Sequence, residues 1–243
     1  MIDKVVLIPT YNEELAIETV IKNILNNNPD VKIFLADSST DKTPEIAESL
    51  GATVIRTEKL GKGYSVKEAF KTIEAKKLIM IDGDNTYPND LSKIFKLLDN
   101  YDIVFTSRLR GKIEPGAMPL LNTFTNHFTS WYARRFLGIK NTDVMSGLIG
   151  FRYHAYKNLE IKANGFELEV EIIVESFRLN LKAAEIAIEF YNRIGKPKIE
   201  YLDGFRILYH FSKRALPFLW KKSKVQELDM YDLEGNILNS KRA

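Results

Sequence analysis

Short aliphatic runs alternate with amphipathic stretches along the first hundred residues. Val5 to Pro9 is a continuous apolar run, and residues 13–25 place their apolar side chains at the three- and four-residue spacing of a helix. The same alternation predicts further strands at 31–36, 53–56, 77–81 and 102–105, and further helices at 43–50, 64–75 and 89–98. Strands that alternate with helices form βαβ units. We therefore expect an α/β fold, with a mainly parallel, Rossmann-like sheet sandwiched between helices.

The alternation becomes irregular after Arg108. Residues 109–120 contain Gly and Pro and predict a loop, whereas the aromatic-rich residues 121–137 predict a helix. A helix is also predicted at 167–180, and strands at 145–151 and 183–191. We divide the chain into a main domain at 1–203, an amphipathic basic segment at 204–224 and a polar C-terminal tail at 225–243, which we expect to be loosely held.

Composition narrows the class of protein. The 243 residues are 45% hydrophobic, which is enough for one sizeable core. The net charge is only +3, so no overall field favours nucleic acid as a partner. Cysteine is absent, which excludes a disulfide framework, a thiolate metal site and a thiol nucleophile, and fits an intracellular chain. The first apolar run is too short for a signal peptide, and no later run reaches the roughly 18 apolar residues of a membrane span.

Two aspartates end the fourth predicted strand, in the stretch LIMIDGDNTYPND at 78–90. A single glycine separates Asp82 from Asp84, and two ionised carboxylates this close repel each other unless a cation lies beside them or they share a proton. Carboxylate oxygens suit Mg²⁺ or Mn²⁺, and Mg²⁺ is often held by one or two carboxylates together with substrate phosphates. A solvated turn would explain the tripeptide alone, but its place at a strand end favours a metal site.

Other predicted strand ends carry polar groups that could join the same site. PTYNE at 9–13 follows the first strand and DSSTD at 37–41 ends the second, so the two segments and the aspartates should meet at one edge of a parallel sheet. They could bind a ribose and a base, or simply cap the helices that follow. GKG at 61–63 and RIGKPK at 193–198 would suit a diphosphate or another phosphate-rich ligand, with flexible or solvated basic loops as the alternative.

Together these segments resemble family 2 glycosyltransferases of the dolichol-phosphate mannose synthase type. The motifs PTYNE, ADSSTDKT, GKG, DGD, DVMSGLIGFR and NRIGKPK occur in the order typical of that family, and the resemblance spans residues 4–210. It implies a GT-A fold for the main domain at 1–203. It also implies an inverting, metal-dependent transfer of a hexose, mannose or glucose, from a GDP- or UDP-sugar to a polyprenyl phosphate such as dolichyl phosphate.

The resemblance also implies roles for individual residues on the donor side. Asp82 and Asp84 would bind Mg²⁺ or Mn²⁺ and, through it, the diphosphate of the nucleotide-sugar, with Asp84 counted among the catalytic residues. The residues expected around the nucleoside and the phosphates are Pro9, Tyr11, Glu13, Asp37, Lys62, Arg193 and Lys198.

On the acceptor side, Arg108 would face the phosphate of the polyprenyl phosphate, with Asp143 and Ser146 in the neighbouring motif. A phosphate is already an anionic nucleophile and needs little help from a base, so a positioned arginine could suffice. Asp143 is the best candidate if a base is used. Glu167 and Glu169 lie behind it in sequence, and we expect them on an exposed helix face.

The chain departs from the family pattern at three positions. Ala36 stands where the family usually has the first of two aspartates, and Thr86 and Tyr87 stand where many members have Gln and His. The nucleotide, the sugar and the metal preferred therefore stay open.

The amphipathic segments suggest contact with a membrane. Residues 204–224 contain six cations interleaved with apolar and aromatic side chains and no acid, a pattern that suits the interface of an anionic bilayer. Residues 117–137, on the acceptor side, could form a second aromatic patch. We expect a peripheral enzyme on the cytoplasmic face, acting alone or with a membrane-protein partner. The alternatives are a terminal helix packed on the sheet and a family 2 glycosyltransferase with a soluble or glycan acceptor.

Overall fold

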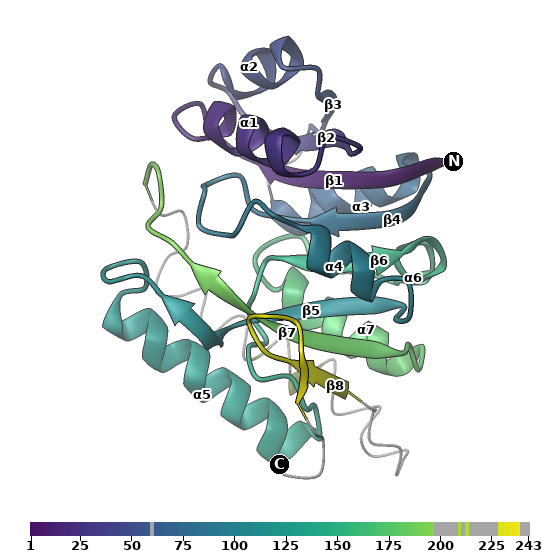
Figure 1. The fold of residues 1–243 in the computed structure, drawn as a ribbon, viewed down its shortest axis with the longest axis vertical. Helices are drawn as coiled ribbons and strands as arrows, with labels where there is room; N and C mark the ends of the chain where they lie inside the picture. Colours follow the sequence, from purple (N-terminus) through teal and green to yellow (C-terminus); the bar gives the residue numbers. More distant parts are fainter. Residues whose placement is uncertain (59–60, 197–208, 210–211, 214–227, 239–243) are drawn as a thin grey trace.

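The computed structural model describes residues 1–58, 61–196, 209, 212–213 and 228–238 (Figure 1). In these residues nine strands form one sheet, in the order β3-β2-β1-β4-β6-β5-β7-β8-β9. The strands are β1 (Ile2–Thr10), β2 (Lys32–Asp37), β3 (Thr53–Arg56), β4 (Ala75–Met80), β5 (Ile103–Ile113), β6 (Ile149–Arg152), β7 (Ala183–Phe190), β8 (Leu228–Tyr231) and β9 (Ile237–Leu238).

Most neighbouring strands in this sheet run parallel. β1 pairs in parallel with β2 and β4, β2 with β3, β5 with β7, and β7 with β8. Only β6, between β4 and β5, and the short β9 run antiparallel to their neighbours in the described chain. The predicted mainly parallel α/β sheet is therefore confirmed, and the carboxyl ends of β1, β2 and β4 meet at one edge.

Helices cover both faces of the sheet, as predicted. One face is covered by α1 (Ile17–Asn27), α2 (Thr43–Ser49) and α4 (Ser92–Leu97). The other is covered by α3 (Lys62–Thr72), α6 (Tyr153–Asn158), α7 (Leu168–Arg178) and the C-terminal part of α5 (Leu120–Leu137). α1 and α2 lie at one end of the molecule and α5 at the other (Figure 1).

The alternation of side chains along β1 explains the two cores. Val5 and Leu7 are fully buried in the core beneath α3 and α7, whereas Val6 and Ile8 are fully buried in the core beneath α1 and α4. Successive side chains of a strand point to opposite faces, so a strand covered on both sides must be apolar throughout. Each such side chain contributes about 1.5–3 kcal/mol by leaving water.

The loop predicted after Arg108 is partly wrong, because β5 continues to Ile113. A register shift between Ser107 and Lys112 interrupts its pairing with β7. A Cβ on Gly111 would lie only 1.7 Å from the carbonyl oxygen of Ile188, so this glycine permits the close approach of the two strands. A glycine that we read as a loop signal thus belongs to a bulge.

The expected loose tail is wrong for residues 228–238, which add β8 and β9 to the edge of the sheet. The Tyr101 hydroxyl donates to Asp229 Oδ2 at 2.6 Å and lies 2.8 Å from the Tyr231 hydroxyl, which anchors this hairpin to the main domain. The short helix α6 was also not predicted. Segment 204–224 lies outside the described residues except at 209, 212 and 213. None of the helices that the structure describes has the length and apolarity to cross a membrane.

Candidate functional site

A cavity of about 610 Å³ opens at the edge where β1, β2 and β4 end. Eight of the predicted site residues line it: Pro9, Tyr11, Glu13, Lys62, Asp82, Asp84, Arg108 and Arg193. Asp37, Asp143 and Ser146 are buried behind this lining, with at most 4% of each residue exposed. Lys198 lies outside the described residues. The structure thus brings together side chains that are up to 184 positions apart, since Pro9 and Arg193 share one cavity.

Asp37 joins the ends of β1 and β2 from beneath the cavity. Its carboxylate accepts hydrogen bonds from Thr10 Oγ1 at 2.7 Å and from Ser39 Oγ at 2.6 Å, and it also pairs with the guanidinium of Arg56. The Ser39 hydroxyl in turn accepts from the backbone N–H of Asn12 at 2.8 Å. Asp37 therefore shapes the loops that follow the two strands, and its direct contact with a base stays a prediction.

Asp82 is paired with a buried lysine. Lys62 Nζ, on the first turn of α3, lies 2.5 Å from Asp82 Oδ1 and also contacts Glu169 Oε1 on α7. Burial alone would lower the pKa of Lys62, but the two carboxylates outweigh it and raise that pKa above its usual range. A Cβ on Gly147 would lie 2.4 Å from Asp82 Oδ2, so only glycine leaves room for the carboxylate there.

Asp84 is paired with the loop after β7. Its Oδ2 contacts the guanidinium of Arg193, and its backbone carbonyl accepts from the N–H of Ile194 at 3.0 Å. Its Oδ1 accepts from Thr86, at 3.1 Å from the backbone N–H and 2.7 Å from the hydroxyl. The departure at Thr86 thus has a local role, because this side chain orients the second aspartate.

Tyr87 has a local role as well. The residue is 2% exposed, and its ring packs edge-on against Phe190 with the centroids 5.4 Å apart. Its hydroxyl accepts from the backbone N–H of Gly147 at 2.7 Å. Burial raises the pKa of Tyr87 to about 12, so the hydroxyl is neutral at physiological pH. Tyr87 therefore holds the loop of Gly147 against Asp82.

Arg108 lines the cavity and is fixed by Asp143, which lies behind the lining. Its Nε and Nη2 donate to the two carboxylate oxygens of Asp143 at 2.7 and 2.9 Å, and its guanidinium lies 5.2 Å from the centroid of Phe190. Such a bidentate pair fixes the plane of the guanidinium. Since both oxygens of Asp143 face Arg108, the geometry makes Asp143 a counter-ion, and its action as a base stays a prediction. Ser146 Oγ lies 2.7 Å from Thr106 Oγ1.

The prediction that Glu169 lies on an exposed helix face is wrong. It is 6% exposed and lines the cavity, where it pairs with Lys62. The whole stretch from Leu168 to Ser176 is buried, so α7 has no solvated side over these residues. Charged side chains in such a helix need partners. The glutamates that alternate with apolar residues in ELEVEIIVE were a signal for this environment.

Glu185 on β7 is a residue that the sequence did not single out. It is fully buried, and its carboxylate accepts from the backbone N–H of Thr142 at 2.9 Å and from the Thr142 hydroxyl at 2.5 Å. Burial raises the pKa of Glu185 to about 7, although the two hydrogen bonds from Thr142 oppose the rise. Because Thr142 directly precedes Asp143, Glu185 supports the loop that positions Arg108.

Residues 5–160 match the family described as "Glycosyl transferase family 2". The chain is 34% identical to the low-salt glycan biosynthesis hexosyltransferase Agl6 of Haloferax volcanii over 83% of its own length, but it spans only about half (51%) of that relative. It is 31% identical to the dolichyl-phosphate hexose transferase of the same organism, over 83% of this chain and 89% of that one.

Among solved structures, glucosyl-3-phosphoglycerate synthase from Mycobacterium tuberculosis, in complex with Mn²⁺, UDP and glucosyl-3-phosphoglycerate, superposes with a TM-score of 0.69 at 19% identity. The superposition covers 97% of this chain and 86% of the other. At this identity the likeness speaks for the fold alone, and the expected GT-A fold is confirmed.

We predict that Glu185→Gln removes a pH-dependent loss of stability. The pKa of Glu185 is about 7 in the folded chain and should return to about 4.5 on unfolding. The folded state thus binds the extra proton, so stability is full below about pH 4.5 and falls as the pH rises through 7. Urea unfolding at pH 5 and pH 8 should show the Gln variant gaining about 1–3 kcal/mol over wild type with rising pH. Glu45→Gln, at an exposed position on α2, is the control, and equal pH profiles for Glu185→Gln and wild type would contradict the assignment.

Proposed function

Because this chain belongs to glycosyl transferase family 2, we propose that it is an inverting hexosyltransferase that moves mannose or glucose from a GDP- or UDP-sugar to a polyprenyl phosphate. The likeness to a dolichyl-phosphate hexose transferase over most of both chains supports this acceptor. We also propose that the protein works peripherally, on the cytoplasmic face of a membrane.

The main observation in favour of a lipid-linked acceptor is that the two sides of α5 differ: one lines the cavity and the other is apolar and exposed. Asn122 and Asn126 line the cavity from this helix. Its other side exposes Leu120, Leu121, Phe124, Phe128, Trp131 and Phe136, each between 42% and 89% exposed. We call these six residues the α5 apolar face. One helix therefore borders the cavity and also offers a surface that water does not favour.

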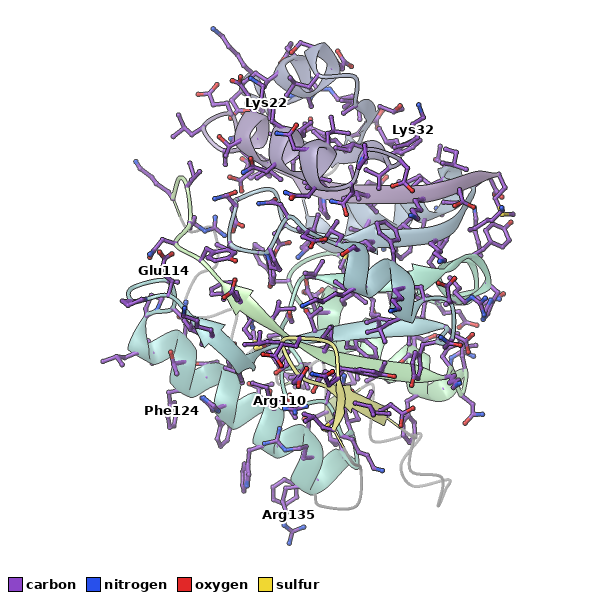
Figure 2. All side chains as sticks on the ribbon, viewed as in Figure 1. Lys22, Lys32, Arg110, Glu114, Phe124 and Arg135 are labelled. Carbon is purple, nitrogen blue, oxygen red and sulfur yellow. The ribbon has the colours of Figure 1, made fainter. Side chains whose placement is uncertain are left out.

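Charge and shape around the α5 apolar face suit an anionic bilayer. The rings of Phe124, Phe128, Trp131 and Phe136 follow one another at centroid distances of 5.6–6.2 Å. α5 contains no acidic residue, and Arg134 and Arg135 lie in its last turn. Phe124 and Arg135 both point away from the sheet (Figure 2). Aromatic and basic side chains on one helix are typical of segments that lie in the membrane interface.

The residues after β4 could hold a divalent ion if the donor supplied the remaining ligands. Asp82 and Asp84 both line the cavity, and Gly147 leaves space beside Asp82 that any side chain would fill. The described residues contain no group of three or more His, Cys, Asp or Glu side chains placed to hold a metal. The diphosphate of the donor would thus have to supply further ligands, as is common for Mg²⁺. Bound Mg²⁺ or Mn²⁺ would stabilise the negative charge of the departing diphosphate.

The residues of the chain would divide the remaining work. Arg108, held in one plane by Asp143, would orient the acceptor phosphate. An oxygen of that phosphate forms the new bond to the anomeric carbon while the bond to the diphosphate breaks on the opposite face, which inverts the configuration. The electron pair leaves with the diphosphate, beside Lys62 and Arg193, and Lys198 would add a further cation. No proton has to be removed from the acceptor phosphate, so no side chain has to act as a general base.

We predict that Asp84→Asn lowers hexose transfer at least 100-fold, because a carboxylate that meets the metal and the diphosphate is lost. The measurement is incorporation of labelled mannose or glucose from GDP- or UDP-sugar into an acid-labile polyprenyl phosphate. Asp90→Asn, an exposed aspartate in the same loop, is the matched control. Equal rates for Asp84→Asn and wild type would sink the assigned site, and transfer only to soluble phosphorylated or sugar acceptors would replace the lipid acceptor.

We predict that the double variant Phe124→Ser, Phe128→Ser binds anionic vesicles at least tenfold more weakly than wild type, because two large apolar side chains no longer enter the interface. Co-sedimentation with phosphatidylglycerol vesicles measures the bound fraction. Leu15→Ser is the control, since this side chain is 73% exposed next to α1, at the far end of the molecule from α5. Undiminished binding of the double variant would show that α5 does not dock on the membrane.

A further inference from the structure

Each aspartate of the DGD motif shares its cation with a glutamate from another element. Lys62 contacts Asp82 and Glu169. Arg193 contacts Asp84, and its Nη1 lies 3.9 Å from Glu13 Oε1. Glu13 follows β1 and Glu169 lies on α7, so neither glutamate belongs to the motif. The same arrangement thus occurs twice: one cation between a motif aspartate and an outside glutamate.

These contacts compete with metal binding. Both oxygens of Asp84 already face donors, Thr86 on Oδ1 and Arg193 on Oδ2. A divalent ion that binds Asp84 would need lone pairs on the same oxygens. It would also repel the positively charged guanidinium of Arg193 beside it. The four carboxylates and two cations carry a formal charge of −2, the charge that one divalent ion balances. The net charge of the site therefore suits a divalent ion, but Lys62 and Arg193 occupy the carboxylate oxygens that would bind it.

We propose that Lys62 and Arg193 act as internal counter-cations of Asp82 and Asp84, and that metal binding depends on a nucleoside diphosphate that draws Arg193 away from Asp84. Glu169 and Glu13 are then positioning residues, which keep each cation beside the cavity while its aspartate turns to the metal. This inference rests on the donor site of the proposed function and adds the order in which its parts assemble.

The two cations differ in how easily they can move. The Lys62 side chain is 12% exposed and that of its second partner, Glu169, is 8% exposed, so this pair is locked between α3 and α7. The Arg193 side chain is 28% exposed and lies on a loop, with its second carboxylate at the longer distance of 3.9 Å. Arg193 is therefore the cation that leaves its aspartate, whereas Lys62 stays on Glu169.

The test is calorimetric titration of Mn²⁺ into the full chain, alone and with saturating UDP or GDP. For wild type we expect weak binding of Mn²⁺ alone and at least tenfold tighter binding with the diphosphate that fits. Arg193→Ala should bind Mn²⁺ alone at least fivefold more tightly than wild type, and the gain from the diphosphate should shrink. Lys22→Ala is the control for loss of one positive charge, since Lys22 lies on α1 and forms an exposed ion pair with Glu18.

Glu169→Gln is a second variant, for which the expected change in Mn²⁺ affinity has the opposite sign. Lys62 would then have Asp82 as its one carboxylate, so Mn²⁺ alone should bind at least fivefold more weakly, whereas UDP or GDP without metal should bind no more weakly than to wild type. A merely structural defect would weaken both. Unfolding midpoints within a few degrees of wild type would show that the variants are folded.

Three results would overturn the inference. Unchanged Mn²⁺ affinity in Arg193→Ala would show that the arginine does not compete for Asp84. An undiminished gain from the diphosphate in that variant would show that Arg193 does not couple the two ligands. Wild-type protein that binds neither UDP nor GDP in the presence of Mn²⁺ would overturn the proposed donor site itself, and the inference with it.

Discussion

Two carboxylates one glycine apart, at the end of a buried strand, repel each other, and positive charge beside them offsets that repulsion. In this protein Lys62 and Arg193 provide that charge, one from the start of α3 and one from the loop after β7. The surrounding residues serve this requirement: Thr86 orients Asp84, and Tyr87 holds the loop of Gly147 against Asp82. The negative charge of the DGD motif is therefore balanced by cations from distant parts of the chain.

Other carboxylates at and behind the cavity are also paired with cations. Arg108 is paired with Asp143, and Arg56 is paired with Asp37 beneath the ends of β1 and β2. In each pair the carboxylate is fully buried, and the loss of one partner would leave an uncompensated charge. The parallel sheet makes this possible because the carboxyl ends of its strands bring these charges to one edge. A pocket built from paired charges is well suited to ligands that carry phosphates, which can exchange places with the carboxylates.

The sequence predicted the parts of the fold in which periodicity and burial agree. The strands and helices through residue 98 follow the apolar pattern, since β1, β2 and β4 are covered on both faces. Gly111 misled the prediction because a glycine marks both a loop and a close approach of strands. The hairpin of β8 and β9 was missed because its short edge strands carry little apolar signal.

Most of the residues that the motifs predicted for the site come together, because eight of them line one cavity. The motifs could not reveal that Asp37 and Asp143 lie behind its lining, or that Glu185 is buried, since these facts depend on packing between distant elements.

The most direct test of the account is a crystal structure of this protein with Mn²⁺ and UDP or GDP. We expect the ion between the diphosphate and the carboxylates of Asp82 and Asp84, with Lys62 still paired to Glu169 and the Arg193 guanidinium on the diphosphate. An ion bound elsewhere, or Arg193 still paired with Asp84 beside a bound ion, would contradict the claim that these aspartates exchange internal cations for a metal and a donor.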